Sequence, residues 1–168
     1  MTYNPVVEVN FEFPKEFLLK FFKEYYPEMT DYTTPEYLKN ITDLDDTVPG
    51  FKVDEENYFH QSLTPIAEEF CKKYNITDAY VTHFLVVEPN AYLPWHEDGK
   101  EATCALNCLL SNDNVPVEFE SGEYYYNTAL LDVRKSHRVK NGPTQRIIFR
   151  ISFVGNSTYD EICNKIYS

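Results

Sequence analysis

Two histidines and one aspartate occur in an order and at a spacing that suit a metal site. His96 and Asp98 form an H-x-D motif within residues 94–99 (PWHEDG), and His137 opens a later short run of strand-forming residues. If the motif is extended, its period of two places the His96 imidazole and the Asp98 carboxylate on one face. A strand that brings His137 to the same face would complete two histidines and one carboxylate, a ligand set that suits non-haem Fe(II).

The alternative to a metal site is that the motif has no function, because a short H-x-D pattern also arises by chance. The chain has 4 histidines, and the other two, His60 and His83, are interpreted as structural or surface residues. Trp95 and Tyr92 flank the motif and are candidates for a substrate wall, although aromatic residues in an aromatic-rich chain are more often core.

Two arginines follow His137 on a strand that alternates cleanly. Arg146 lies nine residues after His137, and Arg150 lies four residues further on. Both fall on one face with Ile148 and Ser152, while the opposite face is wholly apolar. The arginine face is therefore either solvated or the lining of a polar cavity, and in the second case N-terminal helices would cover the apolar face.

Short strand-like runs separated by turn residues dominate the chain from Ala79 onward. Their number and spacing favour a sandwich or jelly roll over a parallel α/β fold. The runs are Tyr80 to Val87, Thr103 to Leu110, Val115 to Glu120, Tyr124 to Asn127, Ala129 to Val133, His137 to Lys140 and Arg146 to Val154.

The N-terminal part differs in pattern. Residues 6–13 alternate like a strand, residues 15–26 and 61–74 have helical spacing, and Thr158 is expected to cap a final helix over residues 158–167. We predict a single domain with an N-terminal strand and helical layer (1–78), a jelly-roll core (79–154) and a C-terminal short helix (155–168). The acidic stretch 40–56 has no clear period and a Pro49-Gly50 turn, so it is interpreted as a loop, with a mobile lid over the site as a hypothesis.

Composition limits the partners. The formal net charge is -12, from 15 Lys+Arg against 27 Asp+Glu, and this charge disfavours nucleic acid. No run approaches eighteen apolar residues and no signal peptide is recognisable, so we expect no membrane span and a cytoplasmic location. The 4 cysteines lack paired C-x-x-C spacing and are interpreted as reduced and mostly buried, with a zinc knuckle at Cys104 and Cys108 as the lesser alternative.

In this order, the H-x-D pair, the distal His137 and a following arginine resemble the Fe(II)/2-oxoglutarate-dependent oxygenases, whose core is a double-stranded β-helix. The resemblance covers roughly residues 79–154, and the segment from Val87 through His96 is similar to the lead-in of prolyl hydroxylases. It implies that His96, Asp98 and His137 hold Fe(II). It also implies that Arg146 receives the distal carboxylate of the co-substrate 2-oxoglutarate, with Arg150 as the alternative.

The reaction implied by the resemblance is a hydroxylation. It would consume O2 and 2-oxoglutarate, release succinate and CO2, and modify an amino-acid side chain that is free or in a peptide. Two departures from the family stand out: the interval from Asp98 to His137 is short, and Val87 stands where prolyl hydroxylases often have a tyrosine near the co-substrate. Asn107 is a candidate for that missing contact, or else a satisfied core amide.

Two other functions remain compatible with the sequence. A cupin-like jelly roll that isomerises or binds a small molecule would need the metal but not Arg146. A non-catalytic structural jelly roll would need neither. The residues indicate no particular substrate or oligomeric state.

Overall fold

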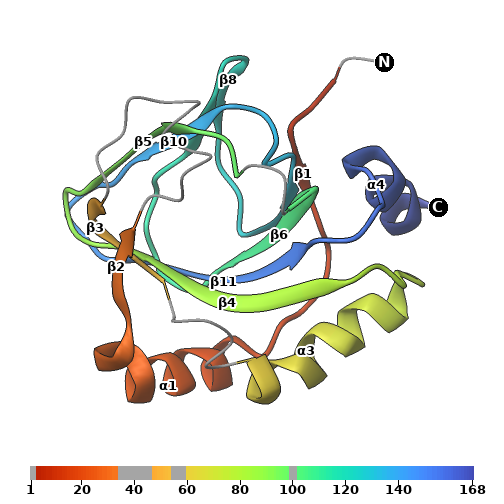
Figure 1. Cartoon of the computed structure of the whole chain (residues 1–168), viewed down its shortest axis with the longest axis horizontal. Helices are drawn as coiled ribbons and strands as arrows, with labels where there is room; N and C mark the ends of the chain where they lie inside the picture. Colours follow the sequence, from red (N-terminus) through yellow and green to blue (C-terminus); the bar gives the residue numbers. More distant parts are fainter. Residues whose placement is uncertain (1–2, 34–46, 54–59, 99–101) are drawn as a thin grey trace.

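The computed structural model describes residues 3–33, 47–53, 60–98 and 102–168. Its strands form two antiparallel sheets that face each other, with helices on the outer side of the larger sheet (Figure 1). This is the predicted jelly roll with an N-terminal helical layer. Within the described residues, no helix is long and apolar enough to cross a membrane.

The larger sheet has seven strands in the order β1-β9-β6-β11-β4-β3-β2. Their bounds are β1 Val6–Glu8, β2 Thr30–Thr33, β3 Thr47–Val53, β4 Tyr80–Val87, β6 Cys104–Leu109, β9 Thr128–Leu131 and β11 Arg146–Phe153. The smaller sheet has four strands in the order β5-β10-β7-β8, with bounds β5 Tyr92–His96, β7 Val117–Phe119, β8 Gly122–Tyr124 and β10 His137–Lys140. Strand β11 lies at the centre of the larger sheet, between β6 and β4, and therefore holds its arginines in a fixed register.

The helices are α1 (Lys15–Tyr25), the short 3-10 helix η1 (Tyr26–Glu28), α3 (His60–Lys73) and α4 (Tyr159–Tyr167). Figure 1 shows α1 and α3 beneath the larger sheet and α4 at its end. Helix α4 begins with a capping box, in which Glu161 N donates to Thr158 Oγ1 and Thr158 N donates to a Glu161 carboxylate oxygen. The cap predicted at Thr158 is confirmed.

The apolar face of β11 packs on the N-terminal helices. Ile147, Phe149, Ile151 and Phe153 share one buried cluster with Leu18 and Phe22 of α1 and with Leu63 and Phe70 of α3. Phe149 is fully buried and contacts Phe13 and Phe84 edge-on or tilted, at ring-centroid distances of 5.7 and 6.1 Å. This packing fixes which face of β11 looks into the space between the two sheets, and that face carries Arg146 and Arg150.

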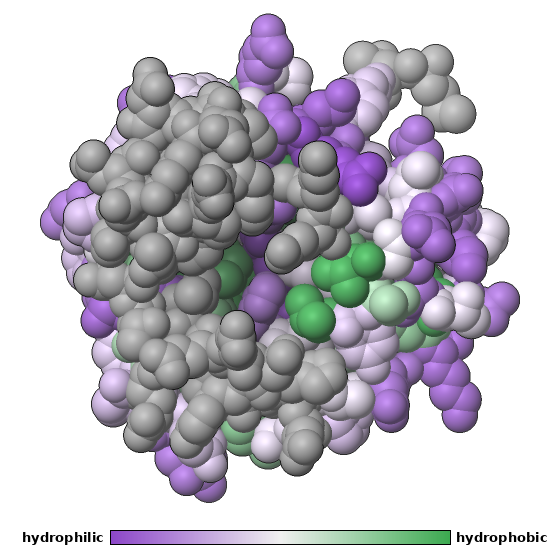
Figure 2. All heavy atoms as spheres, viewed as in Figure 1, coloured by the Kyte–Doolittle hydropathy of each residue, from purple (hydrophilic) through white to green (hydrophobic). Residues whose placement is uncertain are grey.

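A second apolar cluster fills part of the space between the sheets. Leu85, Ala105 and Ile148 from the larger sheet meet Val117, Phe119 and Val139 from the smaller one. Figure 2 shows hydrophilic atoms at the base of a hollow in the face viewed in Figure 1, with hydrophobic atoms beside it. The space between the sheets is thus apolar in part and polar in part.

The structure corrects the interpretation of residues 40–56 as a loop. Residues 47–53 form β3, which pairs with β2 and β4. The Pro49-Gly50 pair does not turn the chain but lies in a bulge, where the register shifts and Gly50 takes a positive φ of 76°. A bulge tolerates both residues inside a strand, which explains the missed pattern. The other residues of the proposed lid lie outside the described ones.

Two strand boundaries were also predicted wrongly. Strand β1 ends at Glu8 rather than at residue 13, and residues 125–127 are not a strand. Strand β8 instead starts at Gly122, whose φ of 140° no other residue type adopts readily. As a result Tyr126 lies in the connection between β8 and β9, from which its side chain reaches into the space between the sheets.

Candidate metal centre

His96 and His137 lie opposite each other on two paired strands. β10 pairs with β5 in a register that makes His137 the direct partner of His96, and with β7 so that His137 is also the partner of Phe119. The two imidazole centroids are 4.3 Å apart, and the Phe119 ring stacks on His137 at 5.3 Å. Strand pairing and stacking therefore fix both rings on the inner face of the smaller sheet.

Each of these histidines is oriented by a backbone carbonyl two residues before it. His96 Nδ1 lies 2.7 Å from Pro94 O, and His137 Nδ1 lies 2.7 Å from Lys135 O. Because a carbonyl oxygen only accepts, each Nδ1 carries the proton, and Nε2 keeps its lone pair for a metal ion.

Asp98 closes the group from the connection that follows β5. Its backbone N–H donates to Val133 O at 2.9 Å, which anchors the residue to the connection between β9 and β10. Asp98 Oδ1 lies 3.3 Å from His96 Nε2 and 3.5 Å from His137 Nε2. Donor atoms about 2.1 Å from one ion, at angles of roughly 90–110°, lie about 3.0–3.4 Å apart, so these spacings suit a shared ion.

His96, Asp98 and His137 form the one group of three or more His, Cys, Asp or Glu residues that could hold a metal ion in the described part of the chain. Their ligand atoms all lie within 4.8 Å of one another. The alternative zinc knuckle finds no support there, since Cys104 and Cys108 are buried in the apolar cluster under the larger sheet.

The electrostatics of the group favour an ionised Asp98 carboxylate beside a neutral His137 imidazole. Burial by itself would raise the pKa of the Asp98 carboxyl, but the adjacent His96 imidazole and the positive charge of Arg150 hold it well below its usual range. Burial and the neighbouring His96 lower the pKa of His137 to about 4. Deprotonated Asp98 and neutral His137 are the forms that bind a metal ion.

Arg150 fixes the second oxygen of Asp98. Its Nη1 donates to Asp98 Oδ2 at 2.8 Å, and its Nε donates to Asn107 Oδ1 at 2.8 Å. Oδ1 of Asp98 is thus left for the ion while Oδ2 is held in place. Arg150 is a positioning residue for the carboxylate, and the solvated alternative for the arginine face is wrong.

Arg146 lies deeper in the same face of β11 and is 1% exposed. Its Nη1 pairs with Asp113 and also donates to Val115 O at 2.9 Å, while its Nη2 donates to the Tyr126 hydroxyl at 3.3 Å. Its Nε is buried and has no hydrogen-bond partner among the described residues. A buried guanidinium N–H without a partner is costly, and a carboxylate on that edge would satisfy it.

Asn107 links the two arginines. Besides accepting from Arg150, it donates through Nδ2 to the Tyr126 hydroxyl at 2.9 Å, and Tyr126 in turn contacts Arg146. Asn107 is 2% exposed and fully engaged in this network. A continuous hydrogen-bonded chain therefore runs from Asp98 at the candidate metal centre to Arg146.

Two residues of this region, Tyr126 and Asp113, were missed from the sequence. Tyr126 places a hydroxyl beside Arg146, whereas Val87, the strand partner of Arg146, offers only an apolar side chain. Asp113 was assigned only to a turn. His83, interpreted as structural or surface, is the strand partner of Arg150, and its Nε2 lies 3.2 Å from Ser152 Oγ, which agrees with a structural residue.

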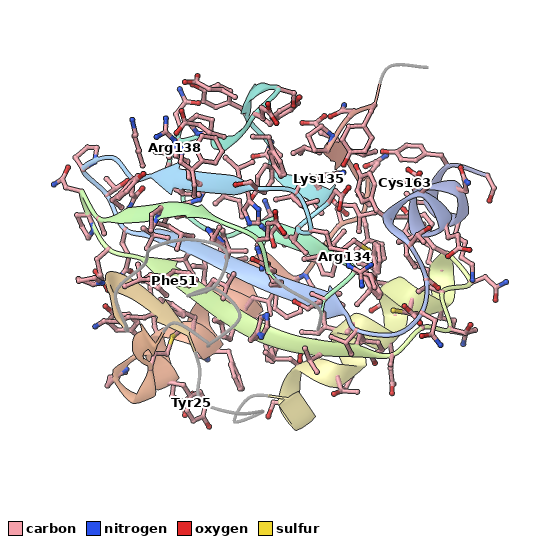
Figure 3. All side chains as sticks on the ribbon, turned by 45° about the horizontal axis from the view of Figure 1, so that its top comes forward. Tyr25, Phe51, Arg134, Lys135, Arg138 and Cys163 are labelled. Atoms are coloured by element: carbon pink, nitrogen blue, oxygen red, sulfur yellow. The ribbon has the colours of Figure 1, made fainter. Side chains whose placement is uncertain are left out.

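Trp95 and Tyr92 do not border the metal group directly. Tyr92 is 44% exposed, and the Arg138 guanidinium lies 4.7 Å from the Trp95 ring. Arg138 follows His137 on β10, so it faces outward, as Figure 3 shows, and binds Glu118 of β7 through two hydrogen bonds. The aromatic pair thus belongs to the outer surface of the smaller sheet rather than to the core or the site.

No protein-family model matches the chain, and no curated protein matches it either. Solved structures do share its fold. It is similar to a Pseudomonas putida prolyl-4-hydroxylase, with 10% identity, a TM-score of 0.51, and coverage of 84% of this chain and 86% of the other.

Two further structures are similar at lower scores. One is the viral collagen prolyl hydroxylase of Paramecium Bursaria Chlorella virus-1 in a 2OG complex, with 11% identity, a TM-score of 0.47, and 90% and 95% of the two chains covered. The other is a 2OG-Fe(II) oxygenase family oxidoreductase from Burkholderia pseudomallei, with 10% identity, a TM-score of 0.42, and 91% and 98% covered. At these identities the likeness is one of fold. The double-stranded β-helix expected from the resemblance is confirmed.

Proposed function

We propose that this protein is an Fe(II)- and 2-oxoglutarate-dependent oxygenase that hydroxylates an amino-acid side chain, free or in a peptide. The observation that carries the proposal is the connection between the two halves of the site. His96, Asp98 and His137 converge within 4.8 Å, and hydrogen bonds lead from Asp98 to a buried arginine whose Nε has no partner.

The donor set fits the metal. Two imidazoles and one carboxylate leave coordination positions free, and this is the facial arrangement of non-haem Fe(II) sites. The Nδ1–H donors of His96 and His137 and the Arg150 contact to Asp98 orient all three ligands from behind. His96, Asp98 and His137 would hold the ion, which when bound supplies the activation of O2 and of the 2-oxo acid.

The two arginines of β11 also suit an oxo diacid. Arg146 and Arg150 share one face of β11 four residues apart, so one guanidinium lies beside the metal group and the other lies further along the strand. In this proposal the edge of Arg146 formed by Nε and Nη2 receives the distal carboxylate, and the Tyr126 hydroxyl aligns it. Arg150 keeps its role of holding Asp98. The apolar residues Phe119 and Ile148 between the sheets help to exclude water.

Two points support the class of substrate. The lead-in from Val87 to His96 is similar to that of prolyl hydroxylases, and one solved structure of similar fold, with a TM-score of 0.51, is a prolyl-4-hydroxylase. The net charge of -12 argues against a nucleic-acid substrate.

An anaerobic titration tests the proposal. Fe(II) is added to the metal-free protein, then 2-oxoglutarate, and the weak visible charge-transfer band of the chelated 2-oxo acid is followed. We expect the band in the parent and its loss in Asp98→Asn and His137→Ala. Arg138→Leu is the matched control for arginine loss, and it should leave the band unchanged because Arg138 faces outward.

The alternatives give different results. Tight metal binding without any band at millimolar 2-oxoglutarate would contradict the proposal and favour a cupin-like protein. Absence of metal binding would favour a non-catalytic jelly roll. With the band established, O2 consumption and succinate release in the presence of peptide or amino-acid candidates identify the substrate.

A further inference from the structure

The arginine proposed to receive the co-substrate, Arg146, already forms an ion pair with a buried carboxylate. The Asp113 and Arg146 side chains are each 1% exposed, and Asp113 pairs with Arg146 Nη1. Asp113 is itself held in place by Ser111 Oγ and by the Val115 N–H, which lies 3.4 Å from its Oδ1. The carboxylate is therefore a fixed, buried neighbour of Arg146 and not a surface group that happens to lie nearby.

We propose that Asp113 is a specificity-determining residue: it offsets the charge of Arg146 and so weakens the preference of the pocket for an oxo acid with a distal carboxylate. The inference rests on the function proposed above, because it concerns the far end of the same co-substrate pocket.

The donors of Arg146 show what remains for a ligand. Nη1 has two hydrogens, and Asp113 Oδ1 and Val115 O take both. Nη2 uses one hydrogen on the Tyr126 hydroxyl, and Nε uses none. One hydrogen on Nε and one on Nη2 thus have no partner among the described residues, and in this proposal they are the donors that receive a ligand oxygen beside Asp113.

The charge balance is what distinguishes this pocket from one with an unpaired arginine. Asp113 and Arg146 together are neutral, and a second carboxylate on the same guanidinium would leave one net negative charge in a buried space. Repulsion between two carboxylates about 6 Å apart, at an effective dielectric of about 20, corresponds to on the order of a hundredfold in affinity. An oxo acid with a neutral distal end does not meet this repulsion.

The test compares two oxo acids of equal size. The first is 2-oxoglutarate, and the second is 5-methyl-2-oxohexanoate, in which an isopropyl group replaces the distal carboxylate. Both chelate through the same 2-oxo acid end, so anaerobic titration of the Fe(II)-loaded protein gives both dissociation constants from the charge-transfer band. The quantity of interest is their ratio, neutral acid over 2-oxoglutarate.

Asp113→Asn removes the charge and keeps the shape and the contacts to Ser111 and Val115. We expect the ratio to rise at least tenfold in this variant, mainly through tighter binding of 2-oxoglutarate. Glu118→Gln is the matched control: it removes one carboxylate that pairs with an outward-facing arginine on β10, and it should leave the ratio unchanged. Thermal unfolding of each variant checks that the fold persists.

The unsubstituted protein gives an independent check. Its ratio should be below about thirty, whereas an arginine with no internal partner would discriminate by several hundredfold or more. A ratio above a thousand in this protein, or an unchanged or smaller ratio in Asp113→Asn, would overturn the role of Asp113 and leave the oxygenase proposal intact. If neither acid binds either form, the proposed function fails and this inference with it.

Discussion

Substitution of Arg146 should lower the stability of the fold, independently of any effect on a reaction. Arg146→Met removes the partner of Asp113, whose side chain is only 1% exposed. An ionised carboxylate would then remain buried with two neutral contacts, from Ser111 Oγ and the Val115 N–H. Breaking a buried pair on one side costs about 3–5 kcal/mol. We expect Arg146→Met to lower the free energy of unfolding by that amount at neutral pH.

A double variant separates the effect of Arg146 on stability from its effect on binding of 2-oxoglutarate. Asp113→Asn in the Arg146→Met background removes the unpaired carboxylate charge. About 2–3 kcal/mol of the lost free energy of unfolding should therefore be regained. Affinity for 2-oxoglutarate should not return, because the guanidinium is still missing. Urea unfolding of the metal-free proteins measures the first quantity, and the anaerobic band measures the second. Arg138→Leu serves as control in both assays.

Two results would refute this reasoning. If Arg146→Met lost less than about 1 kcal/mol, the buried pair would not have the energetic weight that its burial implies. If the double variant bound 2-oxoglutarate as tightly as the parent, Arg146 would not be the partner of the distal carboxylate, and Arg150 would take that role.

Three further predictions concern other parts of the molecule. Arg150→Leu should weaken Fe(II) binding about 10–100-fold, measured by competition with a chelator, because Asp98 Oδ2 loses its partner; unchanged affinity would show that the contact is dispensable. In the metal-free protein the pKa of His83 is lowered to about 3 by burial and by Arg150, and that of His137 to about 4 by burial and by His96. The unfolded chain therefore binds more protons, and the free energy of unfolding in urea should fall as pH decreases from about 6.5 toward 4. His83→Gln should reduce this pH dependence, and a slope equal to that of the parent would contradict the part assigned to His83. Phe149→Ala should cost about 3–5 kcal/mol in urea unfolding, whereas Phe17→Ala on the 50% exposed position should cost far less, and equal losses would be inconsistent with the packing of β11 on the helices.

Much of the fold followed from periodicity. The alternation of β11 predicted which face carries the arginines, and the apolar stripes of α1 and α3 predicted that these helices cover the opposite face. These patterns are strong because each side of a central strand meets a different environment. Thr158 was recognisable as a cap because Glu161 stands three residues later.

Other features depend on contacts that no local pattern contains. Strand β3 was hidden by Pro49 and Gly50, which indicate a turn locally but lie in a bulge between β2 and β4. Tyr126 was placed in a strand because its neighbours are aromatic, although it lies in a connection. In each case pairing with strands distant in sequence determines the outcome, and local propensity does not report such pairing.

Some residues of the candidate site could be predicted from the sequence, and others could not. The H-x-D spacing and the distal histidine were readable because a metal site needs specific residue types, and the structure brings His96, Asp98 and His137 together. The pairing of Asp113 with Arg146 joins residues 33 positions apart and left no signal in the sequence. The proposal of Arg146 rather than Arg150 for the distal carboxylate rests on the observation that Arg150 already binds Asp98.

A crystal structure of the protein with Mn(II) and 2-oxoglutarate is the most direct measurement of the central claim. Mn(II) replaces Fe(II) without supporting turnover and is located by its anomalous signal. The proposal predicts one ion bound by His96 Nε2, His137 Nε2 and Asp98 Oδ1, with the 2-oxo acid end on the ion and the distal carboxylate on the Nε and Nη2 edge of Arg146. An ion held elsewhere, or a distal carboxylate on Arg150 or in solvent, would contradict it.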